Sequence, residues 1–140
     1  SIPGAALAAF IIGEIKAYFR GSVRLATDAG IRQIVLDPGI GFGKTPGHNL
    51  EIIGRLREFA DLGYPVMVGV SRKSFIGAIL GLPVGERLEG TIGASVAAVM
   101  KGARILRVHD VREVVRAVRV AEAILAWDAA HKREPWNCSG

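Results

Sequence analysis

The chain has 140 residues, half of them hydrophobic, and a formal net charge of +5. This length and composition allow a buried core in one domain or part of one, and they exclude a disordered chain. The longest apolar run, Ala5 to Ile12, is far shorter than the roughly 20 residues of a membrane span, and no basic segment precedes it as in a signal peptide.

The positive charge is spread along the chain. Arg112, Arg116 and Arg119 fall at helical spacing, as on a solvated helix face, and only 6% of the residues are aromatic. We therefore expect no nucleic-acid partner, and the positive field suits an anionic small substrate. The single cysteine, Cys138, cannot form an internal disulfide, which fits a reducing compartment. The expectation is a soluble cytoplasmic protein with no membrane partner.

Residues 5–29 predict one helix or a pair of helices, disturbed near Gly21. After them a unit repeats three times: a helical stretch ends in glycine, a short apolar run follows, and polar residues stand at the carboxyl end of that run. Glycine past a helix end fits a left-handed cap, and uninterrupted apolar runs fit parallel strands that are covered on both faces. The glycines and the runs after them are Gly30 with 34–36, Gly63 with 66–70, and Gly102 with 105–108.

The segments between these runs predict helices. An apolar stripe over residues 50–59 follows Asn49, which is the candidate N-cap. The small residues over 93–98 fit a helix that packs closely on the sheet. Asp110 and Glu113 form a start to the last helix that is similar to a capping box.

Three strands with flanking helices cannot close a barrel, because a (β/α)8 barrel needs about 250 residues. An open three-stranded sheet would leave apolar edges uncovered, and Ser1 is not an initiator methionine. We therefore expect an α/β chain that is the carboxyl-terminal part of a TIM (β/α)8 barrel, with its last three parallel strands, over residues 1–127. Residues 128–140 are expected to form a polar tail.

The first strand is followed by a glycine-rich loop over residues 37–45. Its end, Gly43-Lys44-Thr45, matches a nucleotide-binding P-loop, but that motif requires glycine where Pro38 stands. A wide glycine turn would instead let Asp37 point into a site while Phe42 forms a wall. An Asp before a Pro can also simply start a turn, and the motif alone leaves both interpretations open.

The second and third strands end in cations. Arg72 and Lys73 are flanked by serines, a composition suited to an oxyanion or carboxylate, although surface cations at a helix start would look similar. Arg107 and His109 are two residues apart and so point the same way from their strand. Because barrels place catalytic groups at the carboxyl ends of their strands, we expect these residues to converge with Asp37 on one site.

Three segments, in this order, resemble the carboxyl-terminal signatures of the dihydropteroate synthase family: residues 37–44 (DPGIGFGK), 69–74 (GVSRKS) and 107–111 (RVHDV). The resemblance covers about residues 13–125. It implies a transferase of folate biosynthesis that condenses p-aminobenzoate with a dihydropterin methyl diphosphate and releases diphosphate. It also implies a homodimer and a Mg²⁺ ion whose ligand is expected in an amino-terminal part outside this chain. The 140 residues alone are therefore expected to be inactive.

The resemblance also implies roles for single residues. Asp37 would accept paired N–H bonds from the aminopterin ring, and Lys73 would donate to the pterin carbonyl, with Gly69 close to the ring. Arg107 would stack on the pterin and, together with His109, stabilise the departing diphosphate.

The p-aminobenzoate would contact Phe42 and Ser71, which border its pocket in this interpretation. The catalytic residues are then Lys73, Arg107 and His109, and none of the site residues is a metal ligand. The full substrate-binding set is Asp37, Phe42, Gly69, Ser71, Lys73, Arg107 and His109.

Two alternatives to the synthase stay open. A pterin-binding methyltransferase barrel, which passes a methyl group to a corrinoid protein, should lack the Ser-Arg-Lys and Arg-Val-His segments. A non-catalytic pterin-binding fragment is the other alternative. A hydrolase is disfavoured, because His109 has no partner serine in a strained elbow.

Overall fold

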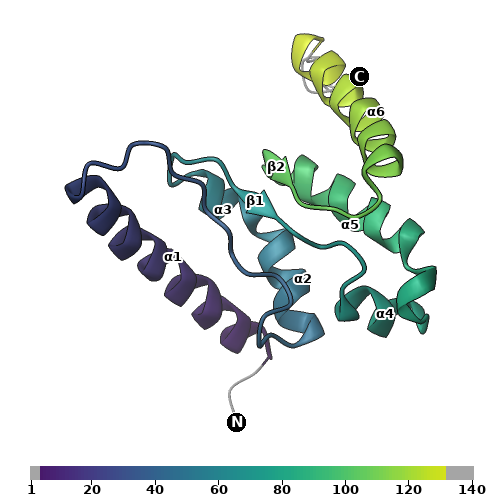
Figure 1. The fold of residues 1–140 in the computed structure, drawn as a ribbon, viewed down its shortest axis with the longest axis horizontal. Coiled ribbons are helices and arrows are strands. Elements are labelled where there is room, and N and C mark those ends of the chain that lie inside the picture. Colours follow the sequence, from purple (N-terminus) through teal and green to yellow (C-terminus); the bar gives the residue numbers. More distant parts are fainter. Residues whose placement is uncertain (1–3, 132–140) are drawn as a thin grey trace, which may run out of the picture.

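The computed structural model describes residues 4–131, which form helices around a short parallel sheet (Figure 1). In Figure 1, α1 lies on one side of the strands, and α6 extends away from the rest of the chain. No helix in this described range combines the length and apolarity that crossing a membrane requires. The elements are α1 (Gly4–Asp28), α2 (Pro46–Gly54), α3 (Leu56–Ala60), β1 (Met67–Val68), α4 (Ser74–Leu80), a 3-10 turn (Val84–Glu86), α5 (Leu88–Met100), β2 (Ile105–Leu106) and α6 (Val111–Ala130).

Three segments run parallel in the middle of the fold, and two of them are strands. β1 and β2 pair in parallel, with Met67 opposite Ile105. The segment 34–36, predicted as a strand, contributes a single parallel bridge between Leu36 and Val66. Ile34 and Val35, which precede the bridge, take no part in the sheet, so the segment is shorter than predicted.

The core lies between the strands and the helices. Val66, Val68 and Val70 of the central run are fully buried on one face of the sheet, and Met67 between them is half-buried. Phe19 of α1 meets Phe59 of α3 edge to face, with ring centroids 5.6 Å apart. The continuous apolar pattern of this run therefore predicted its burial correctly.

The glycines that follow the helices are left-handed, as predicted. Gly30, Gly63 and Gly102 have φ values of +82°, +95° and +110°. The predicted disturbance near Gly21 is wrong, since α1 is continuous from Gly4 to Asp28. A glycine inside a helix lowers its stability without necessarily bending it.

The predicted N-cap at Asn49 is also wrong, because α2 begins earlier. Thr45 is the N-cap, and its Oγ1 accepts the N–H of His48 at 3.2 Å. Pro46 occupies the first helical position, where its fixed φ suits the helix. Asn49 is buried in the helix and instead accepts the backbone N–H of Gly41 at 2.8 Å. Asn49, predicted as a helix cap, therefore holds the loop that contains Gly41.

The predicted capping box at α6 does not form either. Asp110 precedes the helix, but its side chain makes no capping hydrogen bond. Its carboxylate pairs with Arg72, while Glu113 accepts hydrogen bonds from Arg112. Charged partners, one distant in the chain and one adjacent, have replaced the predicted capping bonds.

The segment predicted as a polar tail begins inside a helix. α6 continues through Ala130, three residues into the predicted tail. Val114 and Ala121 are the buried residues of this helix, which packs on α5. Residues 132–140, with Cys138, lie outside the described residues.

α5 is the predicted helix of small residues, and its packing leads to a first prediction. A methyl group at Gly90 would overlap Cγ2 of Ile76 and lie 3.0 Å from Cδ1 of Leu80. Gly90→Ala is therefore expected to destabilise the chain by about 1–3 kcal/mol, because buried Ile76 must leave its rotamer or α4 must shift to make room. The free energy of unfolding, from urea denaturation, measures this effect.

Gly93→Ala in the same helix is the matched control. A methyl group at Gly93 has nothing within 4 Å, so alanine should raise stability by about 0.5–1 kcal/mol through its helix propensity. Equal effects of the two substitutions would contradict the close packing of α5 on α4.

Candidate functional site

Three of the predicted site residues meet at the end of the central run. A methyl group at Gly69 would lie 3.4 Å from both Nε and Nη2 of Arg107 and 3.7 Å from Nζ of Lys73. The guanidinium and the ammonium group therefore lie beside the bare backbone of Gly69. Two cations around a residue without a side chain leave space for a flat, electron-rich group.

The glycine-rich loop closes over Lys73 from the opposite side. Nζ of Lys73 donates to the carbonyl oxygen of Ile40 and lies 5.2 Å from the ring centroid of Phe42. A methyl group at Gly41, whose φ is +89°, would lie 3.0 Å from Cδ of Lys73. The loop therefore needs glycine here for both its backbone angle and its close approach. Phe42, predicted as a wall, is 67% exposed and presents its ring to the Lys73 ammonium.

Two residues that the sequence did not predict as site residues hold this loop in place. Asn49 is 1% exposed, and its Oδ1 accepts the N–H of Gly41. Nζ of Lys44 donates to the carbonyl oxygens of Gly39 at 2.8 Å and Phe42 at 3.2 Å. Lys44 thus folds back on its own loop, which is a different use from the phosphate contact of a P-loop lysine.

Asp37 both starts a turn and faces the cations. Its Oδ1 accepts the N–H of Gly39 at 2.9 Å, as in an Asx turn. Oδ2 makes no hydrogen bond with the described residues, and its side chain is exposed. Both interpretations of the sequence are therefore compatible: one carboxylate oxygen builds the turn and the other is available to a donor.

The electrostatics of the site centre on Lys73. Burial lowers the pKa of the Lys73 ammonium, and the positive charge of Arg107 lowers it further. The carboxylate of Asp37 acts in the opposite direction and raises it, while Lys44 adds a small lowering effect. Lys73, Arg107 and Asp37 are therefore close enough for their charges to interact, and the cations outnumber the carboxylate.

These interactions predict how the pKa of Lys73 changes in variants. Asp37→Asn should lower the pKa further, because it removes the charge that raises it. Arg107→Gln should raise the pKa, because it removes a repelling cation. An NMR titration of the Lys73 side-chain nitrogen measures both shifts, with Glu113→Gln, on the outer ion pair of α6, as a control that should leave the value unchanged. Shifts of the same sign in the first two variants would contradict this geometry.

Ser71 and His109 form a separate contact at the strand ends. Ser71 Oγ lies 2.8 Å from His109 Nδ1 and accepts the His109 backbone N–H at 3.1 Å. The Ser71 hydroxyl can donate its proton to Nδ1, and in that arrangement the ring proton lies on Nε2. Ser71 is 8% exposed, and its hydroxyl is directed at His109 and not at solvent.

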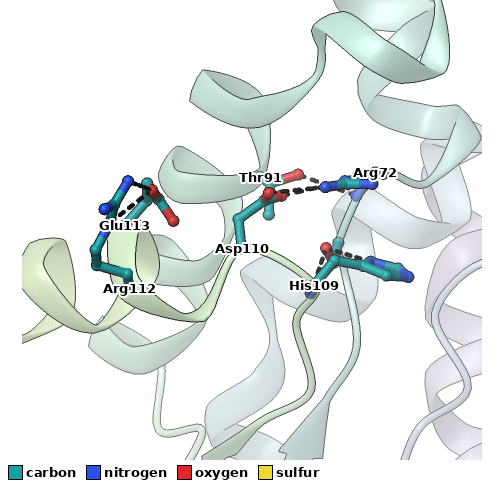
Figure 2. Close-up of polar contacts among 7 residues, drawn as sticks. Arg72, Thr91, His109, Asp110, Arg112 and Glu113 are labelled. Atoms are coloured by element: carbon teal, nitrogen blue, oxygen red, sulfur yellow. Dashed lines mark hydrogen bonds and ion pairs between the residues drawn. The ribbon is translucent and has the colours of Figure 1, made fainter.

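Arg72 and Lys73 are adjacent in the chain, and together they were one candidate for an oxyanion or carboxylate site. In the structure their side chains take different partners. The Arg72 guanidinium donates to Oδ2 of Asp110 at 3.1 Å and to Oδ1 at 2.7 Å (Figure 2). Arg72 lowers the pKa of the Asp110 carboxyl through these hydrogen bonds. Asp110 and Thr91, which accepts the Arg72 N–H at 2.9 Å, were not identified from the sequence as site residues.

The described residues do not fit a metal ion. Between residues 4 and 131, no cluster of three or more His, Cys, Asp or Glu side chains has the arrangement of a metal site. The groups at the strand ends are mostly cationic, and hard divalent cations require oxygen ligands. No chemical step is therefore assigned to a metal in this part of the chain.

Known proteins are similar to this chain in sequence and in fold. The family model for pterin binding enzymes matches residues 7–109. The dihydropteroate synthase of Escherichia coli (strain K12) is 45% identical over 118 residues, which are 83% of this chain and 42% of that protein. The enzyme of Bacillus subtilis (strain 168) is 45% identical over 112 residues, or 79% of this chain and 39% of that one. The chain thus spans about two fifths of the length of these curated relatives.

Solved structures agree with the sequence matches. A dihydropteroate synthase from Coxiella burnetii in complex with pteroic acid has a TM-score of 0.84 at 36% identity, covering 86% of this chain and 46% of that one. The enzyme from Thermus thermophilus in complex with 4-aminobenzoate has a TM-score of 0.79 at 48% identity, covering 81% and 45%. The resemblance inferred from the three sequence segments is confirmed.

Proposed function

The chain belongs to the pterin binding enzyme family, and from this premise we propose that it carries the carboxyl-terminal part of a dihydropteroate synthase active site. One observation supports the proposal most strongly: Arg107 and Lys73 lie together beside Gly69, under the glycine-rich loop. The substrates proposed are p-aminobenzoate and a dihydropterin methyl diphosphate. The relatives crystallised with pteroic acid and with 4-aminobenzoate support this choice.

The fold proposed for this function is the last part of a TIM barrel. The parallel bridge at Leu36 and the β1–β2 pair place three consecutive parallel segments side by side, each followed by a helix. Their carboxyl ends carry Asp37, Ser71 and His109, and this edge is where such barrels hold their active sites. Residues 1–127 are proposed as the barrel part.

The pterin would lie against Gly69. A flat ring can approach bare backbone there, with the guanidinium of Arg107 stacked on its face. The free oxygen of Asp37 would accept N–H bonds from the amino-substituted edge of the ring. Lys73 would exchange its bond to the Ile40 carbonyl for one to the pterin carbonyl.

The reaction forms a bond between the aniline nitrogen of p-aminobenzoate and the methylene carbon of the pterin, while the bond from that carbon to the diphosphate oxygen breaks and the nitrogen releases one proton to solvent. Negative charge grows on the diphosphate as it leaves, so fixed donors that face this charge accelerate the step. Arg107 and Lys73 supply positive charge, and Nε2–H of His109, oriented by Ser71, supplies a further donor. Phe42 would border the p-aminobenzoate.

A chimera tests the proposed function directly. The aligned segment of this chain replaces the 118 matching residues of the E. coli relative, whose own remaining sequence supplies the rest of the enzyme. We expect the folded chimera to form dihydropteroate from the two substrates. A chimera that folds and binds p-aminobenzoate but forms no product would contradict the proposal.

The 140-residue chain is tested alongside the chimera. Titration with pteroic acid, combined with an assay for dihydropteroate, is expected to show binding without turnover. This result, together with an active chimera, would support a site completed by other segments. Binding by the chain with an inactive chimera would instead favour the alternative of a non-catalytic pterin-binding protein.

Three expectations stay predictions, of which the first two rest on the family resemblance and the third on the sequence composition. They are a homodimer, a requirement for Mg²⁺ bound outside the described residues, and a cytoplasmic location. A methyltransferase barrel is the less favoured enzyme, because it should lack the Ser-Arg-Lys and Arg-Val-His segments. Both segments are present here and supply side chains at the strand ends.

A further inference from the structure

The segment between Ser71 and Lys73 has an unusual backbone. Arg72 has a φ of +56°, the one positive value at a residue other than glycine in the described chain. Such a conformation persists at an arginine only where the surroundings hold it in place. Its effect is to send neighbouring side chains in different directions: Ser71 contacts His109, and Lys73 contacts the glycine-rich loop.

Three residues hold Arg72 in this conformation. Oγ1 of Thr91, a fully buried residue, accepts the Arg72 N–H at 2.9 Å. Nη1 of Arg87 donates to the Arg72 carbonyl oxygen at 2.9 Å. Both oxygens of Asp110 accept from the Arg72 guanidinium, in the fork geometry that orients an arginine most strongly (Figure 2). The backbone N–H, the backbone carbonyl and the side chain of Arg72 are therefore each held by a different residue.

The supporting residues are themselves fixed in the fold. The Arg87 guanidinium lies flat against Gly77 of α4, where any side chain would overlap it. Thr91 lies in α5, which packs on α4. Asp110 directly follows His109, so its ion pair with Arg72 also joins the end of the β1 segment to the end of the β2 segment.

From these contacts we infer that Asp110, Thr91 and Arg87 are positioning residues for the proposed reaction, which act through Arg72 to hold Lys73 and His109 at one edge of the sheet. This inference rests on the proposed function. None of the three needs to touch a substrate. Their loss should weaken the contribution of Lys73 and leave the charges of the site in place.

The chain provides a matched control in the ion pair of Arg112 and Glu113. Oε1 of Glu113 accepts from Arg112 at 3.0 and 2.7 Å, one turn along α6 from Asp110 (Figure 2). Arg112 is 74% exposed at its side chain, and in the described part of the chain the hydrogen bonds of this pair join only its two members. Glu113→Gln therefore removes the same kind of interaction without affecting the Arg72 turn.

The test compares Asp110→Asn, Thr91→Val and Glu113→Gln in the 140-residue chain and in the chimera. Asp110→Asn and Thr91→Val are expected to weaken pteroic acid binding and to lower kcat by about tenfold, while Glu113→Gln stays within about twofold of the parent. Thr91→Ser keeps the hydroxyl and should restore binding.

Coupling to Lys73 separates positioning from a general loss of structure. If Asp110 acts through Lys73, then Asp110→Asn should have little further effect on kcat in a Lys73→Met background. Full additivity of the two substitutions would overturn the inference. So would parent-like binding by both Asp110→Asn and Thr91→Val.

A measurement without ligand distinguishes this inference from the proposed function. Amide hydrogen exchange at residues 71–73 should be faster in Asp110→Asn and Thr91→Val and unchanged in Glu113→Gln. If the parent protein neither binds pteroic acid nor turns over, the proposed function fails, and faster exchange would still show that these residues hold the turn. Unchanged exchange in all three variants would refute the positioning role.

Discussion

Replacing Lys73 with methionine in the chimera is expected to lower kcat/KM for dihydropteroate formation on the order of 1,000-fold. Methionine is an unbranched side chain one atom shorter than lysine, and it removes the charge that faces the Ile40 carbonyl and the Phe42 ring. The same charge would contact the pterin and the leaving diphosphate, so binding and the chemical step both lose it. Steady-state kinetics with each substrate varied in turn measures the loss.

Lys101→Met is the control for this substitution. Lys101 is an exposed lysine at the end of α5, and its replacement should change kcat/KM by less than about twofold, as expected of a surface substitution. The melting temperatures of both variants should stay near that of the parent. If Lys73→Met retained most of the activity, the proposed role of the strand-end cations would be wrong.

Enlarging Gly69 is the second prediction with a large expected effect. Gly69→Val should weaken pteroic acid binding on the order of 100-fold, because the new methyl groups occupy the space beside Arg107 and Lys73 where the ring would lie. Gly69→Ala should have an intermediate effect, since its single methyl group would sit 3.4 to 3.7 Å from those side chains, at ordinary contact distance. Isothermal titration calorimetry measures the affinity of each variant for pteroic acid.

The control for the Gly69 series is Gly54→Ala, at a glycine where a methyl group has nothing within 4 Å. It should bind pteroic acid like the parent. Unfolding by urea, measured on every variant, separates loss of the site from loss of the fold. A Gly69→Val variant that is stably folded and binds with parent affinity would rule out this position as the floor of the pterin site.

Much of the fold could be predicted from local sequence. Gly30, Gly63 and Gly102 mark helix ends because a left-handed residue after a helix strongly favours glycine. The run from Val66 to Val70 is apolar throughout, and this pattern predicts a strand covered on both faces. Such signals depend on conformational preferences within a few residues, and these are written directly in the sequence.

The candidate site could be predicted as a set of strand ends. The parallel order of the apolar runs predicts Asp37, Lys73 and Arg107 at one edge of the sheet, where Lys73 and Arg107 both lie beside Gly69. What each side chain does at that edge was not predictable. Arg72 and Lys73 are adjacent in the chain, yet one pairs with Asp110 and the other contacts the glycine-rich loop.

The sequence by itself determined where helices end, which run is buried and which chemical groups stand at the strand ends. Only the tertiary structure decided which partners those groups take. Asn49 and Asp110 both have the local pattern of a helix cap, but one holds Gly41 and the other pairs with Arg72, 38 residues away. The physical reason is that folding brings within reach partners that a local pattern cannot show. Asp110 gains a charged guanidinium, a stronger donor than a helix N–H, and Asn49, inside a helix that Thr45 already caps, gains the N–H of Gly41.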